Sequence, residues 1–415
     1  METQVSLYLD TRRSKQHHKY PVKIRVWNAK VRKAMMYPAN LDITQTDFEK
    51  AWNTKNTSKG FKELKITLNA ILGKANKIVA ELSPFTFEQF EKKFHRKYGE
   101  GANIFYQYIQ IITELKKRKQ LGTASSYECG KKSIEQFLLY KNGKIPQRLT
   151  FHEISTSWLL DYESYMIKTL DRSHTTVSMY LRTLRALFNL AIANKEIQPE
   201  FYPFGKRKYK IPASRNIKKA LSKVQLKKLF DSAGKNMEQI KAKDFWFFSF
   251  ACNGMNVKDI AQLKFLDLED DRFSFHRAKT ITTSKTNLKP ITVYLTDFTK
   301  RVIEKYGNAK SEKDNFVFPI LNKKMDAEQQ RKGIQNFTRF INQHVKLLCK
   351  DNDLPRDISS YWARHSFSTH AIRSGATMEF IQESLGHGNL STTMNYFAGF
   401  EDETKKEFAS KIMDF

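Results

Sequence analysis

The chain has 415 residues, and its 72 Lys and Arg against 43 Asp and Glu give a net charge of +29 at neutral pH. At about 100 to 200 residues per domain, this length indicates two to four domains and disfavours a single one. The charge favours a polyanionic partner, either nucleic acid or an anionic membrane surface, and composition alone leaves that choice open.

The three cysteines, Cys129, Cys252 and Cys349, are far apart in the sequence. This excludes the paired spacing of a zinc site and the density of a disulfide scaffold, and it fits a reducing cytosol. The chain begins without a basic region followed by an apolar core, and it contains no run of about 18 apolar residues. We therefore expect a soluble, cytoplasmic protein with no membrane contact.

Residues 5–37 have the period-2 alternation of β-strands. The clearest run alternates Val22, Ile24 and Val26 with Lys23, Arg25 and Trp27. One face of this strand is expected to be buried, and the other would present Lys23, Arg25 and Trp27. These three residues are either DNA contacts or the ordinary solvent side of a half-buried strand.

Helical patterns follow from about Thr46 to Lys97, and Gly99-Glu100-Gly101 indicates a break. The clearest later helix is expected over residues 175–194, where Leu181, Leu184, Phe188 and Ala191 form an apolar stripe. Arg182 and Arg185 lie on another side of this helix. Their two interpretations are a DNA-binding surface and a solvated face.

A basic run bounded by prolines extends from Pro203 to Pro212 and contains Lys206, Arg207 and Lys208. It predicts an extended connection between domains that is suited to crossing a phosphate backbone. Beyond it, residues 244–252 predict a buried helix, and Arg272 to Phe275 and Ile291 to Leu295 predict short strands around a turn-rich segment.

The segment that carries chemistry runs from Tyr361 to Tyr396. Arg364 is expected to open a helix, and a second helix should end at Gly386, immediately before His387. Arginine, a Leu-Gly-His corner 23 residues later, and Thr-Thr-x-x-Tyr with tyrosine nine residues beyond the histidine form an ordered set. This set resembles the tyrosine recombinase (phage integrase) family.

The resemblance continues upstream from about Leu221. Residues 253–260 are similar to the family's first box, with Asn256 in the place of an arginine and Asp259 in that of an acidic residue. Residues 277–280 are similar to its β-turn lysine segment and offer Lys279. Tyr361 stands where the family's His-x-x-Arg motif has its histidine.

The resemblance implies a mainly α fold with small β elements (α+β). It implies an N-terminal three-stranded arm-type DNA-binding module with following helices over residues 1–97, and a helical, SAM-like core-binding domain over 102–205. A basic linker over 206–217 and a mixed α/β catalytic domain over 218–415 complete the expected organisation.

The same resemblance implies the roles of the site residues. Tyr396 would attack the scissile phosphate to give a 3′-phosphotyrosyl intermediate. Arg364 and His387 would bind the phosphate, and Lys279 would protonate the leaving 5′ oxygen. No metal or other cofactor is expected. Asn256 and Tyr361 are degenerate positions, because an amide lacks the guanidinium charge and tyrosine is a poor base at neutral pH.

Arg277 is a candidate to replace the missing charge, because two residues along a strand would place it on the same face as Lys279. The alternative is that Arg277 is a backbone-phosphate contact or a solvated side chain.

The resemblance also implies the partners: double-stranded DNA with core-type and arm-type sites, three further copies of the chain in a tetramer that forms a Holliday junction, and accessory DNA-bending or directionality proteins. The expected location is the nucleoid of a bacterial cytoplasm. The rival functions are a type IB topoisomerase-like enzyme and a decayed DNA-binding accessory protein. The last residues, 401–415, carry Phe408, Ile412 and Phe415 at helical spacing and would pack either on a neighbouring subunit or on their own domain.

Overall fold

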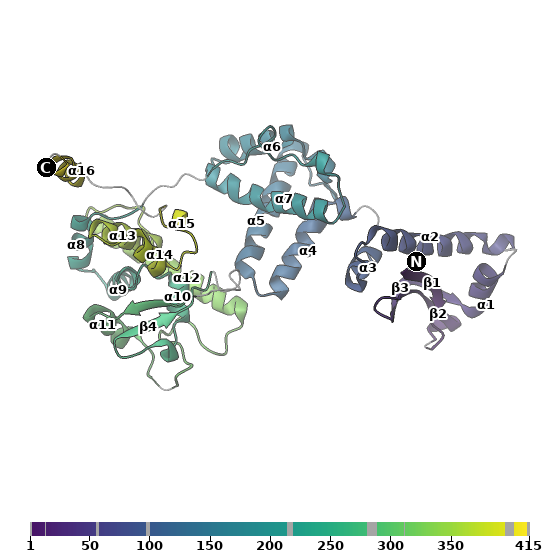
Figure 1. Cartoon of the computed structure of the whole chain (residues 1–415), viewed down its shortest axis with the longest axis horizontal. Coiled ribbons are helices and arrows are strands. Elements are labelled where there is room, and N and C mark those ends of the chain that lie inside the picture. Colours follow the sequence, from purple (N-terminus) through teal and green to yellow (C-terminus); the bar gives the residue numbers. More distant parts are fainter. Residues whose placement is uncertain are drawn as a thin grey trace. The chain divides into compact units, whose positions relative to one another are not determined.

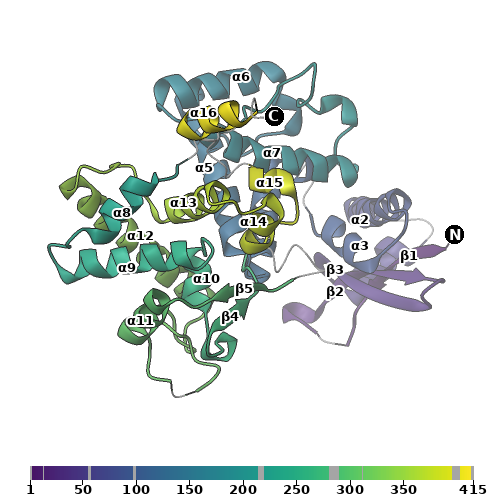
Figure 2. The same cartoon turned by 60° about the vertical axis from the view of Figure 1, so that its left-hand side comes forward.

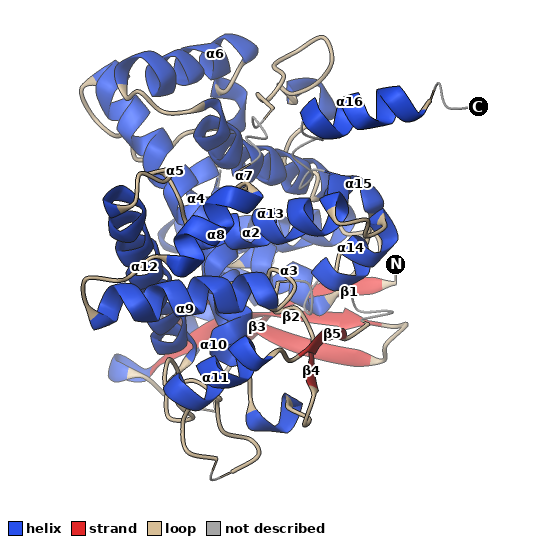
Figure 3. Cartoon of the chain, turned by 90° about the vertical axis from the view of Figure 1, so that its left-hand side faces the viewer, coloured by secondary structure: helices blue, strands red, loops and turns tan. Residues whose placement is uncertain are grey.

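The computed structural model of the chain describes residues 2–12, 14–54, 58–96, 100–213, 219–279, 289–310, 312–394 and 402–412. These residues are mainly helical, with one three-stranded and one two-stranded antiparallel sheet (Figure 3). The expected α+β fold class with small β elements is therefore confirmed. Within the described part of the chain, no helix is both long enough and apolar enough to cross a membrane.

The chain divides into two compact units. The first consists of residues 1–110, 135–161 and 184–209, and the second of residues 111–134, 162–183 and 210–415. Helices α4 (Ile104–Lys117), α5 (Leu121–Asn142) and α7 (His174–Ala193) contribute residues to both units, and α6 (Thr156–Ser164) belongs to the first for most of its length. The four-part division that we expect from the sequence stays a proposal.

The first unit begins with a sheet that lies beside α2 and α3 (Figure 1). Its strands β1 (Thr3–Leu9), β2 (Lys19–Asn28) and β3 (Lys33–Thr44) pair in that order. The predicted alternation is confirmed, because Val22, Ile24 and Val26 are fully buried. Short helix α1 (Gln45–Phe48) follows β3. Helices α2 (Lys62–Glu81) and α3 (Phe87–Phe94) then supply the side chains that cover the aliphatic face.

The other face of this sheet carries side chains at the alternate positions. In register across β1 and β2, Ser6 lies opposite Arg25 and Tyr8 opposite Lys23. Arg25 and Tyr8 are exposed, and Lys23 and Trp27 are half-buried. This face is polar and cationic, as the sequence predicted, although Lys23 donates to the carboxylate of Asp10 at 2.6 Å.

The apolar stripe of α7 is also confirmed, because Leu181, Leu184, Phe188 and Ala191 are all buried, whereas Arg182 and Arg185 are exposed. The basic run that follows is not extended, so that prediction is wrong. The amide of Tyr209 donates to the carbonyl oxygen of Pro203, and Phe204 and Tyr209 are both buried. These two aromatic side chains close a turn that leaves Lys206, Arg207 and Lys208 exposed at its tip.

The second unit has its main core around α9 (Met237–Ala251), the helix predicted to be apolar on most sides. Its buried Phe245, Trp246 and Phe248 are fully enclosed, and α9 packs against α12 (Ala327–Asp351) and α13 (Ser360–Arg373). The other α-helices that lie wholly in this unit are α8 (Lys223–Asp231), α10 (Val257–Gln262), α11 (Asp297–Tyr306), α14 (Met378–Leu385), α15 (Leu390–Met394) and α16 (Asp402–Lys411).

The predicted strands around the turn-rich segment are present as β4 (Arg272–Phe275) and β5 (Ile291–Tyr294). Ile291 and Val293 point into the main core. Helix α14 packs against β5, so the corner after α14 lies beside this small sheet (Figure 2). This packing brings the corner after α14 close to β4 and β5, which are distant from it in the sequence.

Candidate active site

Arg364 is almost fully buried, with 3% of its surface exposed, and its guanidinium is held by backbone. Nη1 donates to the carbonyl oxygen of Gly254 at 3.0 Å, and Nη2 donates to that of Leu385 at 2.7 Å. The residue lies in the second turn of α13, which begins at Ser360, so the expectation that Arg364 opens this helix is wrong. The segment before α10 and the last residue of α14 therefore fix the direction of the guanidinium.

His387 follows directly after α14, as predicted, because Gly386 ends that helix in the left-handed conformation with φ +61°. Its Nε2 lies 3.1 Å from Nη2 of Arg364, and its Nδ1 lies 3.0 Å from the hydroxyl oxygen of Thr393. A guanidinium can only donate, so Nε2 must accept and the ring proton is on Nδ1. His387 is thus a neutral imidazole between Arg364 and α15.

Burial, followed by the charges of Arg364, Arg277 and Lys279, lowers the pKa of His387 from 6.5 to about 3. Desolvation and nearby positive charge both disfavour the imidazolium form. The three cations that act on this ring come from α13 and from the segment that follows β4. The site therefore has a concentrated positive field around a neutral ring, and this field would favour a bound anion.

Arg277 and Lys279 do not share a strand face, and the argument that placed them there is wrong. Strand β4 ends at Phe275, and Arg277 is buried with 9% exposure whereas Lys279 is exposed. Arg277 nevertheless reaches the site, because a Cβ built on Gly386 would lie 3.9 Å from its Cδ atom. The structure therefore places its aliphatic stem beside the corner that carries His387.

Asn256 and Asp259 form a bridge from α10 to the segment after β4. Nδ2 of Asn256 donates to Oδ2 of Asp259 at 3.3 Å, and Oδ1 of Asp259 accepts from the amide of Ala278 at 2.9 Å. Asp259 is buried, with 6% exposure. The residue in the place of the family's first arginine thus contacts the carboxylate that holds the backbone immediately after Arg277.

Tyr361, the other degenerate position, lies one turn before Arg364 on α13 and is 48% exposed. Its ring meets that of the buried His365 edge-on, with 4.8 Å between centroids. Tyr396, the expected nucleophile, lies outside the described residues. Helix α15 ends at Met394, two residues before it, and its Thr393 is the hydroxyl partner of His387.

Two residues that matter for the geometry were part of the quoted motifs but had no assigned role. Gly254 has φ +66°, and a Cβ added there would lie 2.8 Å from the Cα of Arg364, so only glycine fits. Thr393 is fully buried and accepts from His387. The Thr-Thr pair before Tyr396 was the available signal for the second, and the glycine two residues before Asn256 for the first.

A buried arginine fork, a neutral imidazole and two further cations define an enzyme site for an oxyanion such as a phosphodiester. Comparison with known families agrees with this class. Residues 219–403 match the phage integrase family, and residues 103–211 match the phage integrase SAM-like domain.

Named relatives are similar over most of their length. The tyrosine recombinase of Thermosipho africanus is 26% identical, with 74% of this chain and 98% of the relative covered. Tyrosine recombinase XerC of Bacillus pumilus is 25% identical, with 74% and 95% covered. The ICEBs1 integrase of Bacillus subtilis is 23% identical, with 65% and 72% covered.

A solved structure of a lambda integrase dimer bound to a core site resembles the fold, with a TM-score of 0.51 and 13% identity over 72% of this chain and 98% of that one. The Tn1549 transposon integrase in complex with transposon right end DNA gives a TM-score of 0.50 and 16% identity over 74% and 99%. The chain belongs to the tyrosine recombinase (phage integrase) family, whose members cut and rejoin DNA strands.

Proposed function

We propose that this chain is a site-specific recombinase that cleaves and rejoins duplex DNA through a 3′-phosphotyrosyl intermediate and a Holliday junction. The observation that carries the proposal is the buried Arg364–His387 pair, with Arg277 and Lys279 close enough for their charges to act on His387. In a chain with a net charge of +29, this arrangement is suited to one phosphate of a DNA backbone.

Arg364 would bind the scissile phosphate with N–H groups whose direction is already set by the carbonyl oxygens of Gly254 and Leu385. Such preorganised donors stabilise the negative charge that grows on the phosphate oxygens during attack. The incoming anion would also offset the positive field around His387. Its pKa would then rise, and the protonated ring, which carries a proton on each nitrogen, could donate to the phosphate from Nε2.

The chemical step forms a bond between the phenolic oxygen of Tyr396 and phosphorus, and it breaks the bond between phosphorus and the 5′ oxygen. The exposed Lys279 would deliver a proton to that leaving oxygen, because an alkoxide leaves poorly. The phenolic proton of Tyr396 passes to solvent or to a base. Tyr361 is not assigned that role, since phenols have a pKa of about 10.

Arg277 would supply the charge that Asn256 lacks. It is buried beside Gly386, its charge acts on His387, and the backbone after it is held by Asp259. Asn256 keeps a role in this arrangement, because its amide holds the second oxygen of the same carboxylate. The guanidinium would thus come from the segment after β4, and Asn256 and Asp259 would fix the position of that segment.

The partner would be double-stranded DNA with core-type sites and, for the N-terminal sheet, arm-type sites. Exposed Arg25, Arg182 and Arg185 and the half-buried Trp27 are candidate contacts, together with the turn formed by Lys206, Arg207 and Lys208. Four copies would assemble on DNA, with accessory DNA-bending or directionality proteins as further partners, in the nucleoid of a bacterial cytoplasm. Arg277 would act inside the site and not on the backbone outside it.

Ile412 directly follows helix α16 and is 72% exposed. Phe408 lies in α16, but its side chain is not described, and Phe415 lies outside the described residues. Docking of this segment on a neighbouring subunit is one proposal, and packing on its own domain is the alternative. Deletion of residues 405–415 should abolish synapsis and spare DNA binding. Normal recombination by the truncated chain would refute docking in trans.

The test of the proposed function is covalent capture on nicked suicide substrates that carry candidate inverted repeats. The wild type should give a protein–DNA adduct on denaturing gels, and Tyr396→Phe should give none. A decayed accessory protein would bind the DNA and form no adduct. A topoisomerase-like enzyme would relax supercoiled plasmid without producing recombinant junctions, and either result would replace the proposal.

A further inference from the structure

The N-terminal sheet contains a carboxylate that is out of keeping with the charge around it. Residues 1–44 carry nine Lys and Arg against three Asp and Glu. One of the three, Asp10, is buried to 6% exposure at the end of β1. A buried carboxylate next to a DNA-directed surface repels phosphate, so its presence there needs another explanation.

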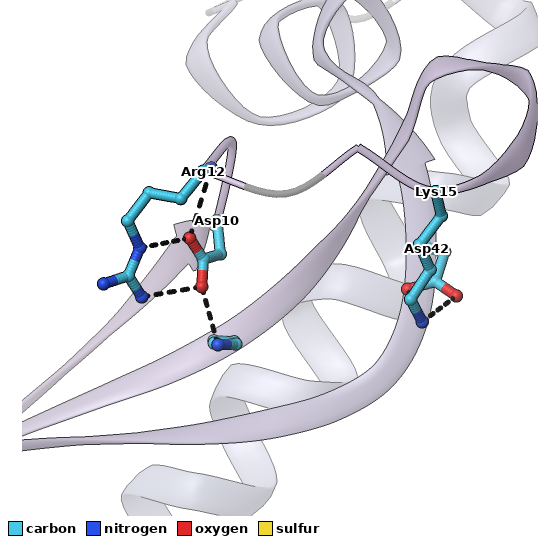
Figure 4. Close-up of polar contacts among 5 residues, drawn as sticks. Asp10, Arg12, Lys15 and Asp42 are labelled. Carbon is cyan, nitrogen blue, oxygen red and sulfur yellow. Dashed lines mark hydrogen bonds and ion pairs between the residues drawn. The ribbon is translucent and has the colours of Figure 1, made fainter.

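Asp10 is the centre of a network of hydrogen bonds (Figure 4). Oδ1 accepts from the backbone amide of Arg12 at 3.4 Å and from its Nε at 2.7 Å. Oδ2 accepts from Nη2 of Arg12 at 2.8 Å and from Nζ of Lys23 at 2.6 Å. These hydrogen bonds hold the pKa of Asp10 well below its usual range, and the bond from the Arg12 side chain has the largest effect. The carboxylate is therefore ionised at any physiological pH.

The two cations in this network come from different places on the sheet. Lys23 lies on the central strand β2, opposite Tyr8 of β1, and its side chain is 24% exposed. Arg12 lies beyond the end of β1, and its side chain is 72% exposed. Asp10 thus ties an exposed guanidinium at the sheet edge to a lysine in the middle of the polar face.

The bonds to Asp10 leave both cations able to contact a further group. A guanidinium has five N–H donors, and Asp10 takes those of Nε and one of Nη2. An ammonium has three, and Asp10 takes one. The remaining donors of Arg12 and Lys23 keep fixed directions, whereas without the carboxylate both long side chains would sample many rotamers.

We propose that Asp10 is a positioning residue for DNA recognition by the N-terminal sheet. Its carboxylate fixes the side chains of Arg12 and Lys23 and lowers the net charge of the group. DNA binding by this face then depends more on the fit between these fixed donors and the DNA than on the total positive charge. The proposal rests on the proposed function, since it takes duplex DNA as the ligand. It makes a prediction opposite to that of simple electrostatics: removal of this negative charge should impair selective binding while strengthening non-selective binding.

The chain offers a matched control in Asp42. Its carboxylate accepts from Nζ of Lys15 at 2.9 and 2.8 Å, but both side chains of this pair are exposed (Figure 4). Asp42→Asn therefore changes the net charge by the same amount as Asp10→Asn. It releases one flexible lysine and leaves the Arg12–Asp10–Lys23 network intact.

The experiment uses the full chain in a Tyr396→Phe background, so that binding is measured without cleavage. Duplexes of 30 base pairs, an arbitrary length of roughly three helical turns, are selected from a randomised library and counter-selected against the Arg25→Ala chain. The counter-selection retains sequences that the polar face of the sheet recognises. The readout is the affinity for a retained duplex divided by that for mixed-sequence DNA.

For Asp10→Asn we expect this ratio to fall at least about fivefold. The plot of log affinity against log salt on mixed-sequence DNA should steepen by about one unit, because one more cation is available to phosphate. Asp42→Asn should leave the ratio unchanged. Arg12→Gln, which keeps the carboxylate and removes its exposed partner, should lower the ratio as well, and it provides the test if Asp10→Asn unfolds.

Equal ratios for Asp10→Asn, Asp42→Asn and the parent chain would overturn the proposal, and so would a library from which no duplex survives counter-selection. Neither result would touch the proposed function, because covalent adduct formation by the wild-type chain is scored separately on nicked substrates. If the wild-type chain gives no adduct but the ratio falls for Asp10→Asn and not for Asp42→Asn, the recombinase function is removed and the role of Asp10 in DNA recognition is kept.

Discussion

The two sides of the candidate active site differ in how they relate to the family pattern. On one side, Arg364 and His387 occupy the family's positions, and every contact described for them is short and buried. On the other, Asn256 stands where an arginine is usual and contacts Asp259 instead. The comparison shows that Asn256 carries no charge, whereas the buried Arg277 contributes to the positive charge that acts on His387. Our proposal that Arg277 replaces the missing guanidinium follows from this difference.

The largest expected effect comes from the side that follows the family pattern. Arg364→Lys keeps the charge but removes the fork that contacts Gly254 and Leu385. We expect cleavage of a nicked suicide substrate to fall by about 10³-fold or more. Thermal unfolding of the same sample separates this loss from a loss of fold. A variant that is folded and cleaves within tenfold of wild type would contradict the role of Arg364 in binding the phosphate.

The next effect tests the side that departs from the pattern. Arg277→Ala should slow cleavage by about 10²-fold, the typical cost of one oxyanion donor. Adding Asn256→Arg to the Arg277→Ala chain should raise the cleavage rate at least about tenfold, because a guanidinium would then be supplied from position 256 in place of position 277.

The control for this pair is Arg185→Ala, which removes an exposed arginine of α7 that is far along the chain from the site. It should weaken DNA binding and leave the cleavage rate at saturating DNA unchanged. If Arg277→Ala cleaves at the wild-type rate, Arg277 is not the substitute and the missing charge comes from elsewhere.

A smaller effect is expected from a change of Thr393, the residue of α15 that contacts His387. Thr393→Val removes the hydroxyl that accepts from Nδ1 of His387 and leaves a buried donor unpaired. Cleavage should fall by about tenfold and the free energy of unfolding by about 1 to 3 kcal/mol. Thr393→Ser keeps the hydroxyl and should retain most of the activity; if Ser and Val behave alike, the hydrogen bond to His387 is not what matters.

The last prediction concerns the dependence of folding stability on pH and not the rate of cleavage. His387 has a folded-state pKa of about 3, below its ordinary value of 6.5. The unfolded chain therefore binds a proton first as the pH falls, and stability is full above about pH 6.5 and declines toward pH 3. This group alone contributes a slope of up to about 1.4 kcal/mol per pH unit.

The measurement is urea unfolding of the DNA-free chain between pH 7 and pH 4. His387→Gln should reduce the slope of the unfolding free energy against pH by up to the amount that corresponds to one proton, because glutamine does not titrate in this range. An unchanged slope would show that His387 is accessible to protons in the folded chain, and the neutral ring between Arg364 and Thr393 would then be the wrong description.

Much of this fold was accessible from the sequence because its signals are local. The alternation of Val22, Ile24 and Val26 determines which face of β2 is buried, and the run from Phe245 to Phe248 marks a core helix. The spacing of Arg364, His387 and Tyr396 predicted the family. Gly386 correctly predicted where α14 ends, because the left-handed turn at a helix end favours glycine.

The failures came from contacts that are distant in sequence. Nothing near Arg277 indicates that α14 packs on β5 and brings Gly386 beside its stem. The basic run after Pro203 read as an extended connection because prolines and charges dominate it, whereas the burial of Phe204 and Tyr209 folds it into a turn. Lys23 was rightly placed on the polar face, but its ion pair with Asp10 depends on where β1 ends.

The most direct test of the central claim is to locate the covalent bond. After reaction with a nicked suicide substrate and digestion with nuclease and trypsin, the peptide of residues 374–405 contains a single tyrosine, Tyr396. We predict that mass spectrometry finds the remaining nucleotide attached to that tyrosine through its 3′ phosphate. A nucleotide on any other residue, or a 5′ linkage, would contradict the assignment of Tyr396 as the nucleophile that acts with Arg364 and His387.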